Sequence, residues 1–154
     1  MRTNLEARLW LTLDLRRSLV GGRVLFVGSD AARTPREGGA VYSISKAASA
    51  MLCRSLALEL GSEIAFALAR PGLVDTAMLE ASRAAPRADF PAGSVYEEMV
   101  ERGEVIAPQT VARFFSWLLY ETSKSEFASD AWDIRDRAHH GHWLEGSLYR
   151  SLPD

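Results

Sequence analysis

Two short apolar runs, separated by one long helical pattern, constrain the fold more than any other feature of the sequence. Residues 23–28 read RVLFVG and residues 64–69 read IAFALA. Such runs are typical of parallel strands that helices cover on both faces. Residues 40–60 between them are rich in Ala, Leu and Met and are followed by Gly61, which predicts a long helix. The order strand, helix, strand predicts a βαβ unit and therefore an α/β fold.

A helix is also predicted before the first strand, over residues 4–19. Its leucines fall on two sides, which indicates burial on two faces. Gly21 and Gly22 are expected to end it. One side carries Leu5, Leu9 and Leu13, and the other carries Leu11, Leu15 and Leu19.

The rest of the chain continues the alternation of elements. Residues 73–106 contain prolines and several charges, and they predict an excursion with one or two short helices. A helix is expected from Pro108, and a last strand near residues 128–134. The chain therefore predicts one domain, residues 1–154, with a parallel sheet of about three strands flanked by helices. The apolar face of the last helix carries Val111, Phe114, Phe115, Leu118 and Leu119.

Charge and cysteine content exclude several classes of protein. The 18 basic and 20 acidic residues are mixed along the chain, so no basic stripe is available for nucleic acid. The single cysteine, Cys53, has apolar neighbours and is expected to be a buried thiol in a reducing compartment. No run is long and apolar enough for a membrane span or a signal peptide, so we expect a soluble cytoplasmic protein.

Three side chains suited to acid/base chemistry follow the first predicted strand. Ser29 ends that strand, and Tyr42 and Lys46 are four residues apart at the start of the long helix, which places them on one face. A nearby ammonium stabilises a phenolate and so suits a tyrosine to proton transfer near neutral pH. A serine hydroxyl beside them can hold a carbonyl oxygen. Taken alone, a Tyr–Lys pair at this spacing arises by chance on many helices, so the joint spacing carries the hypothesis.

The segment GRVLFVGSDAARTPREGGAVYSISKAASAMLCRSLALEL resembles the active-site strand, loop and helix of the short-chain dehydrogenase/reductase family. The resemblance implies that Ser29, Tyr42 and Lys46 are its catalytic Ser, Tyr and Lys. It also makes Asn4 the fourth catalytic residue, which holds a water in a proton relay, although Asn4 alone would also suit a helix cap. The implied fold is a partial Rossmann-type sheet. The implied reaction is NAD(P)H-dependent reduction of a carbonyl, with Tyr42 as general acid and Lys46 on the nicotinamide ribose.

The segment ARPGLVDTAM is similar to the Pro-Gly segment of the same family, which contacts the nicotinamide side of the cofactor. The matching residues are Pro71, Gly72, Val74 and Thr76. A strand-ending turn in which Thr76 caps a short helix is the simpler interpretation, and both can hold together. The expected cofactor is NAD or NADP, with NADP slightly favoured.

The stretch from Asp89 to the WDIRD near the C-terminus is similar to the sepiapterin reductase and benzil reductase subgroup. This second resemblance implies a small ketone or dicarbonyl substrate, or the corresponding alcohol. Apolar residues of the excursion would enclose it, although ordinary core packing also explains each of them. These residues are Met78, Phe90, Tyr96 and Met99.

One departure from the family pattern concerns the cofactor. The glycine-rich turn that accommodates the cofactor pyrophosphate is absent from the sequence, so the resemblance implies that the N-terminal βαβ half is missing. An upstream start, a partner chain that supplies that half, or a decayed gene product would each explain this. The alternative to an enzyme is therefore a truncated noncatalytic remnant. Association is expected through the helices at 4–19 and 40–60, and the unpaired strand edge would favour it.

A cluster of histidines near the C-terminus is a further candidate. His139, His140 and His142 lie within HHGH, but no carboxylate or cysteine stands at a diagnostic spacing, so no metal site is predicted. A flexible polar segment near Trp143 is the simpler expectation.

Overall fold

The sheet is parallel and three-stranded, in the order β1-β2-β3. The computed structural model describes residues 1–128 and 131–150. Strand β1 spans Arg23–Val27, β2 spans Ala65–Arg70 and β3 spans Ala131–Asp133. In the pairing register, Arg23 of β1 lies opposite Ala65, and Leu68 of β2 lies opposite Ala131. The predicted α/β fold with about three parallel strands is confirmed, and β1 lies at one edge of the described sheet.

The N-terminal helix is broken where one continuous helix was predicted. A π-helical turn, η1 (Arg2–Glu6), runs into α1 (Ala7–Asp14), and the short α2 (Arg16–Leu19) follows. The break falls at Leu15, whose backbone leaves the helical region with φ −90° and ψ 1°. Burial on two faces was wrong, because Leu11 and Leu15 are 60% and 50% exposed. Only the side that faces the sheet and the next helix is covered.

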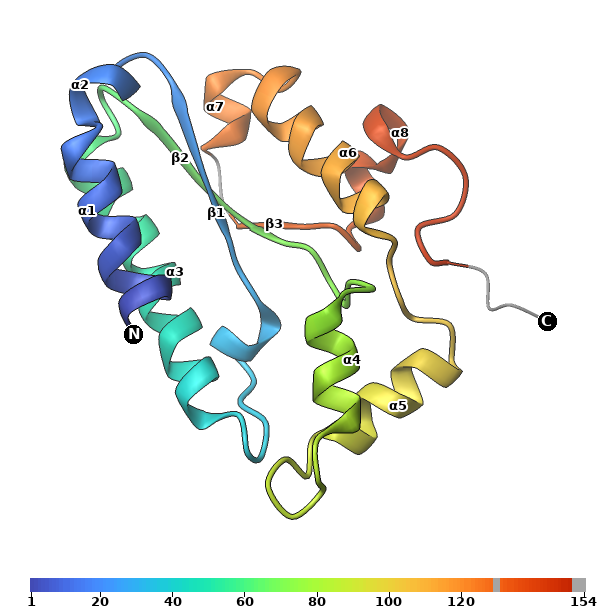
Figure 1. Ribbon diagram of the computed structural model, residues 1–154. Coiled ribbons are helices and arrows are strands. Elements are labelled where there is room, and N and C mark those ends of the chain that lie inside the picture. Colours follow the sequence, from blue (N-terminus) through green and yellow to red (C-terminus); the bar gives the residue numbers. More distant parts are fainter. Residues whose placement is uncertain (129–130, 151–154) are drawn as a thin grey trace.

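Helices α1 and α3 (Ala40–Leu60) lie on one face of the sheet (Figure 1), and the turn η1 before α1 packs against α3. The range of α3 is the one predicted from the sequence. The residues between these helices and the sheet form one hydrophobic cluster, and it includes Cys53, which is 4% exposed as expected. Its fully or nearly buried members are Phe26, Cys53, Leu56, Leu60, Ile64 and Phe66.

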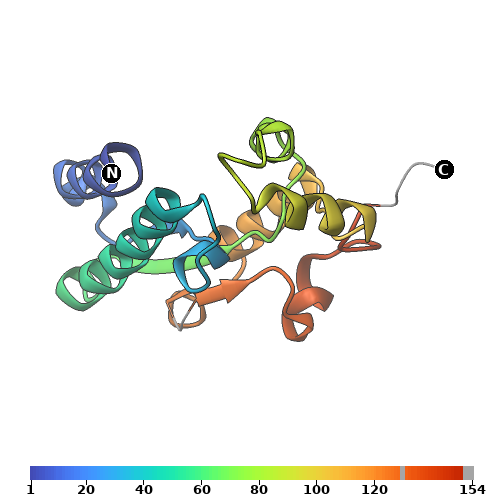
Figure 2. The ribbon, with the colours of Figure 1, turned by 90° about the horizontal axis from the view of Figure 1, so that it is seen from below.

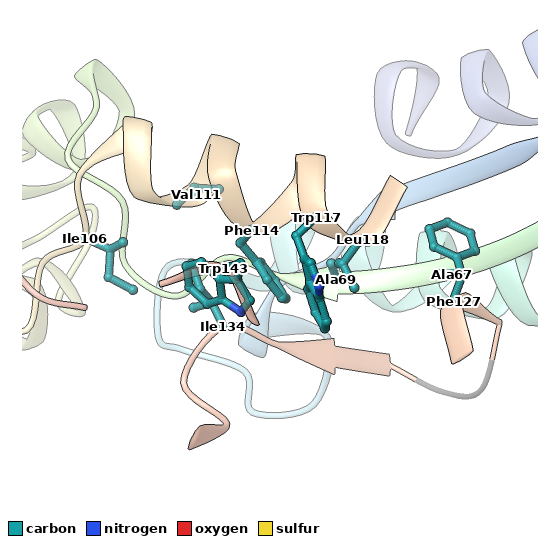
Figure 3. Close-up of a cluster of buried hydrophobic side chains, with 10 residues drawn as sticks. All are labelled: Ala67, Ala69, Ile106, Val111, Phe114, Trp117, Leu118, Phe127, Ile134 and Trp143. Atoms are coloured by element: carbon teal, nitrogen blue, oxygen red, sulfur yellow. The ribbon is translucent and has the colours of Figure 1, made fainter. Parts of the chain in front are cut away.

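The opposite face is covered by α6 (Pro108–Tyr120), α7 (Lys124–Phe127) and α8 (His140–Trp143). Their side chains meet the small Ala67 and Ala69 of β2 in a second hydrophobic cluster (Figure 3). Alternate residues of β2 thus face the two clusters, as the two-residue period of a strand requires. Arg23 at the start of β1 caps the C-terminus of α6. Its guanidinium donates to the Leu118 and Leu119 carbonyl oxygens at 2.8 and 2.9 Å.

The C-terminal segment belongs to the core, so the expectation of a flexible polar segment was wrong. Trp143 is 8% exposed and its ring packs at 5.0 Å from that of Phe114. The sequence pattern of α6 also understated its buried face, because Trp117 is 8% exposed in addition to the predicted Val111 and Phe114. Two tryptophans that the sequence pattern did not assign to the core therefore complete the second cluster.

The excursion forms two short helices, α4 (Ala77–Ala84) and α5 (Gly93–Glu101), in agreement with the prediction. They pack together beyond the carboxyl end of β2, well away from α1 in both views (Figures 1 and 2). The described 3-10 turns are η2 (Asp30–Ala32) after β1 and η3 (Arg137–His139) before α8. The elements that carry the predicted site thus converge at the carboxyl edge of the sheet.

Candidate active site

Ser29 lies at the carboxyl end of β1 and begins the turn η2. Its extended backbone makes it the N-cap of that turn, and its Oγ accepts a hydrogen bond from the Ala31 N–H at 3.2 Å. Because this contact uses an oxygen lone pair, the hydroxyl hydrogen remains available, and no described residue accepts it. Turn η2 packs against α3, the helix that carries Tyr42 and Lys46.

Tyr42 and Lys46 lie in the first two turns of α3 and differ sharply in exposure. The Tyr42 side chain is partly open to solvent, since the residue is 37% exposed, whereas Lys46 is only 8% exposed. The Lys46 Nζ lies 5.7 Å from the centroid of the Tyr42 ring and donates to the Val27 carbonyl oxygen at 3.1 Å. Burial, with the nearby charge of Arg8, lowers the pKa of the Lys46 ammonium. The predicted i, i+4 pair is therefore formed and is fastened to the end of β1.

Asn4 contacts the same part of α3 from the N-terminal π-helical turn. Its Nδ2 donates to Ser45 Oγ at 3.0 Å, and that hydroxyl in turn donates to the Tyr42 carbonyl oxygen at 2.8 Å. Single π-helical turns are frequent at functional sites. The sequence pattern singled out Asn4 but missed Ser45, whose link to Asn4 spans 41 positions of the chain and leaves no local signal.

The Pro71–Gly72 segment follows β2, and the residues after it form backbone hydrogen bonds with the buried Ile106. Gly72 has φ +69°, a conformation that favours glycine. Ile106 donates to the Leu73 carbonyl oxygen at 2.8 Å and accepts from Asp75 N at 3.0 Å, and it pairs with Val74 as an isolated bridge. Thr76 stands at the N-cap of α4 without a side-chain cap bond, and its Oγ1 instead donates to the Val74 carbonyl oxygen at 3.3 Å.

An ion network joins the carboxyl ends of the three strands. Arg135 contacts Asp30 at 2.9 Å and Asp133 at 2.7 Å, and Arg70 donates to Asp133 at 3.2 Å. Burial alone would raise the pKa of the Asp133 carboxyl, but the hydrogen bonds and charge of Arg135, with the charge of Arg70, lower it to about 2. Since Asp30 follows Ser29 and Arg70 precedes Pro71, this network ties the serine turn to the Pro-Gly segment.

The family model described as short chain dehydrogenase matches residues 1–87, more than half of the chain. This chain belongs to the short chain dehydrogenase family. The matched range contains Asn4, Ser29, Tyr42 and Lys46 and also the Pro71–Thr76 segment. It ends before the stretch that suggested the sepiapterin and benzil reductase subgroup, so that subgroup stays a prediction.

Individual relatives of this short chain dehydrogenase chain are longer than the chain itself. The 2,3-dihydro-2,3-dihydroxybenzoate dehydrogenase of Escherichia coli strain K12 is 33% identical over 112 residues, which are 70% of this chain and 45% of that protein. The crystal structure of the KRED1-Pglu enzyme superposes with a TM-score of 0.73 at 27% identity, covering 83% of this chain and 55% of that one. An angucycline C-6 ketoreductase with bound NADP shares the fold at 22% identity and a TM-score of 0.66, covering 84% and 49%. The chain thus spans about half the length of these relatives.

The predicted substrate residues are only partly brought together. The Phe90 and Tyr96 rings stack at 6.0 Å, and the Arg36 guanidinium lies 5.4 Å from the centroid of the Tyr96 ring, so the loop before Tyr42 rests against the excursion. Met78, by contrast, is 66% exposed, and Met99 is half-buried within α5. A cavity of about 450 Å³ lies elsewhere, at the amino end of β2, and its lining residues are Ala57, Gly61, Ser62, Glu63, Ile64, Ala65, Phe66, Lys124, Ser125 and Ala128.

The histidines serve the packing of the second hydrophobic cluster. His139 is 6% exposed, its Nδ1 accepts from Trp143 Nε1 at 2.8 Å, and its Nε2 therefore carries the hydrogen that meets the Asp133 carbonyl oxygen at 3.0 Å. His142 stacks on Trp117 at 5.7 Å. Within residues 1–128 and 131–150, no group of three or more potential metal ligands comes together. Across the same residues, no helix combines the length and apolar character that crossing a membrane requires.

Proposed function

We propose that this chain carries the acid/base side of an NAD(P)H-dependent carbonyl reductase that acts on a small ketone or dicarbonyl. Its single strongest support is the arrangement on α3. The buried Lys46 Nζ, which is hydrogen-bonded to the end of β1, lies 5.7 Å from the centroid of the accessible Tyr42 ring. Open α/β sheets place their ligands at this carboxyl edge. Membership of the family supports the same assignment.

Each group has a defined task in this proposal. Tyr42 donates a proton to the carbonyl oxygen as that oxygen gains negative charge, and its exposure leaves room for the substrate beside it. Ser29 orients the same oxygen, because its hydroxyl hydrogen is unused while its Oγ accepts from Ala31. Lys46 has three N–H donors, of which the Val27 carbonyl engages one, so two remain for ribose hydroxyls.

The residues present fit the nicotinamide end of a cofactor. Two N–H groups of Lys46 remain for the ribose, and Thr76 is exposed further along the Pro-Gly segment. Either NADH or NADPH would supply the hydride when bound. The preference for NADP, the proton relay through Asn4 and the cytoplasmic location stay predictions.

The decisive variant is Tyr42→Phe, because it removes only the hydroxyl. We expect carbonyl-dependent oxidation of NADPH to be abolished while the circular dichroism spectrum and unfolding midpoint stay those of the wild type. Tyr120→Phe is the matched control, since Tyr120 lies on α6 and is 82% exposed. Equal turnover by wild type and Tyr42→Phe would remove Tyr42 from the mechanism.

The alternative proposal is a noncatalytic chain that acts through association. It is favoured by the apolar side chains that α1 and α3 leave exposed, among them Trp10 at 60%, Ile44 at 60% and Met51 at 58%. Large exposed apolar patches mark association surfaces. Fluorescence titration of the purified chain with NADPH and NADH, together with light-scattering mass, separates the proposals. Oligomers without saturable cofactor binding would favour association alone or a need for a partner chain.

A further inference from the structure

Two cations meet on one carbonyl oxygen at the end of β1, and the proposed function uses only one of them. The Val27 carbonyl accepts from Lys46 Nζ at 3.1 Å and from Arg8 Nη1 at 3.4 Å. Arg8 lies on α1, one helical turn after Asn4. The Asn4–Ser45 contact and the Arg8 contacts are thus successive links between the N-terminal helix and the site.

Arg8 is held in place by three contacts with two elements, α3 and β1. Its Nη1 donates to Ser49 Oγ on α3 at 2.6 Å and to Val27 on β1, and its guanidinium carbon lies 5.6 Å from the centroid of the Phe26 ring. The side chain is half-buried, and Ser49 is 1% exposed. A planar guanidinium fixed by a hydroxyl, a carbonyl and a ring has little freedom to move away from Lys46.

No described carboxylate forms an ion pair with either cation. The groups that face them are Tyr42 and Cys53 on α3, and burial raises the pKa of the Cys53 thiol to about 11, which keeps it neutral. An arginine remains charged in proteins, so the repulsion between the two cations acts on the protonation of the lysine. Burial and the charge of Arg8 accordingly lower the pKa of Lys46.

We propose that Arg8 is a positioning residue for Lys46. Arg8 competes with Lys46 for the Val27 carbonyl oxygen, and it thereby governs how tightly Lys46 holds its proton and how many Lys46 N–H groups face a ligand. This inference deepens the proposed function and rests on it for its role in catalysis. The coupling between the two cations is a property of the chain itself and can be measured without substrate or cofactor.

The chain has only two lysines, Lys46 and Lys124, which makes direct observation practical. With ¹³C-labelled lysine, the Cε signals of both residues can be followed by NMR over a pH titration, and Lys124→Arg assigns them. Lys124 is exposed on α7 and serves as the internal reference. Arg8→Met removes the charge and the hydrogen bonds, and Arg8→Gln removes the charge but keeps an amide donor for Ser49.

We expect the Lys46 midpoint to rise in both Arg8 variants, because the repulsion by the Arg8 charge is removed, while the Lys124 midpoint stays unchanged. Arg16→Met is the matched control, because it removes one positive charge from the exposed Arg16–Glu63 pair and should leave Lys46 where it is. An unmoved Lys46 midpoint in either folded Arg8 variant would overturn the proposal.

NADPH titrations of the same proteins separate this inference from the proposed function. A raised Lys46 midpoint together with an altered pH profile of NADPH binding supports both. A raised midpoint in a chain that binds no NADPH supports the coupling and counts against the proposed function. NADPH binding whose pH profile is the same in wild type and Arg8→Gln overturns the role assigned to Arg8.

Discussion

Replacing Gly72 by alanine tests how tightly the Pro-Gly segment is fitted to the core. An alanine Cβ at this position would lie 2.8 Å from Ile106 Cδ1 and 3.4 Å from Ile134 Cγ2, and both isoleucines are fully buried. The backbone φ of +69° adds a conformational cost of about 1–2 kcal/mol for a residue with a Cβ. Overpacking of a filled core adds about 1–3 kcal/mol. We therefore expect Gly72→Ala to lower the free energy of unfolding by roughly 2–5 kcal/mol.

A second substitution separates the two contributions. Ile106→Val deletes Cδ1, the atom that the new Cβ would meet, and by itself should cost about 1 kcal/mol. In the double variant the close contact is gone and only the backbone cost of Gly72→Ala remains. The two substitutions should therefore be non-additive, with an interaction of about 1–3 kcal/mol in favour of the double variant.

Urea unfolding followed by circular dichroism measures all four proteins. Gly141→Ala is the matched control, because Gly141 lies in α8 and no atom lies within 4 Å of the position that an added Cβ would take. It should change stability by less than about 0.5 kcal/mol or stabilise slightly. Additive effects of Gly72→Ala and Ile106→Val, or a Gly72→Ala variant as stable as the wild type, would refute the reasoning.

Two further predictions concern the second hydrophobic cluster. Arg23→Met should cost about 2 kcal/mol in urea unfolding, because the last carbonyls of α6 lose their donor. The exposed Arg113→Met, measured alongside, should cost less than about 0.5 kcal/mol. Burial lowers the pKa of His139, and the hydrogen bond to Asp133 with the charges of Asp133 and Asp136 offsets this only in part. The unfolded chain therefore binds a proton at a higher pH than the folded chain, so stability should fall as the pH drops below about 6.5. His139→Gln should flatten that part of the pH profile, whereas a profile as steep as that of His142→Gln would contradict the assignment.

The parts of the fold that the sequence predicted are those with a strong local pattern. The long helix at 40–60 is rich in Ala, Leu and Met, contains no Gly or Pro and lies between two glycines, and the apolar runs of β1 and β2 are bounded by turn residues. The break at Leu15 could not be predicted, because a backbone change within a leucine-rich stretch has no residue signal such as proline. The burial of Trp143 was missed for a similar reason, since its partner Phe114 is far away in the sequence.

The same distinction applies to the site. The spacing of Tyr42 and Lys46 fixes their common face, because helix geometry makes i, i+4 residues neighbours. Arg8 was not predicted, since an arginine on an amphipathic helix is usually solvent-exposed and only the tertiary structure places it on the Val27 carbonyl. The Asp30–Arg135 pair, separated by 105 positions, likewise depends on the parallel order of the strands.

Contacts among the described residues hold the acid/base groups in place, and this determines what a cofactor titration can reveal. Ser29 is fixed by Ala31, Lys46 by Val27, and the serine turn by Asp30 and Arg135. A folded chain should therefore present these groups in their arranged positions. Failure of a folded chain to bind NADPH would then count against the proposed function, because misplaced proton-transfer groups would not explain it.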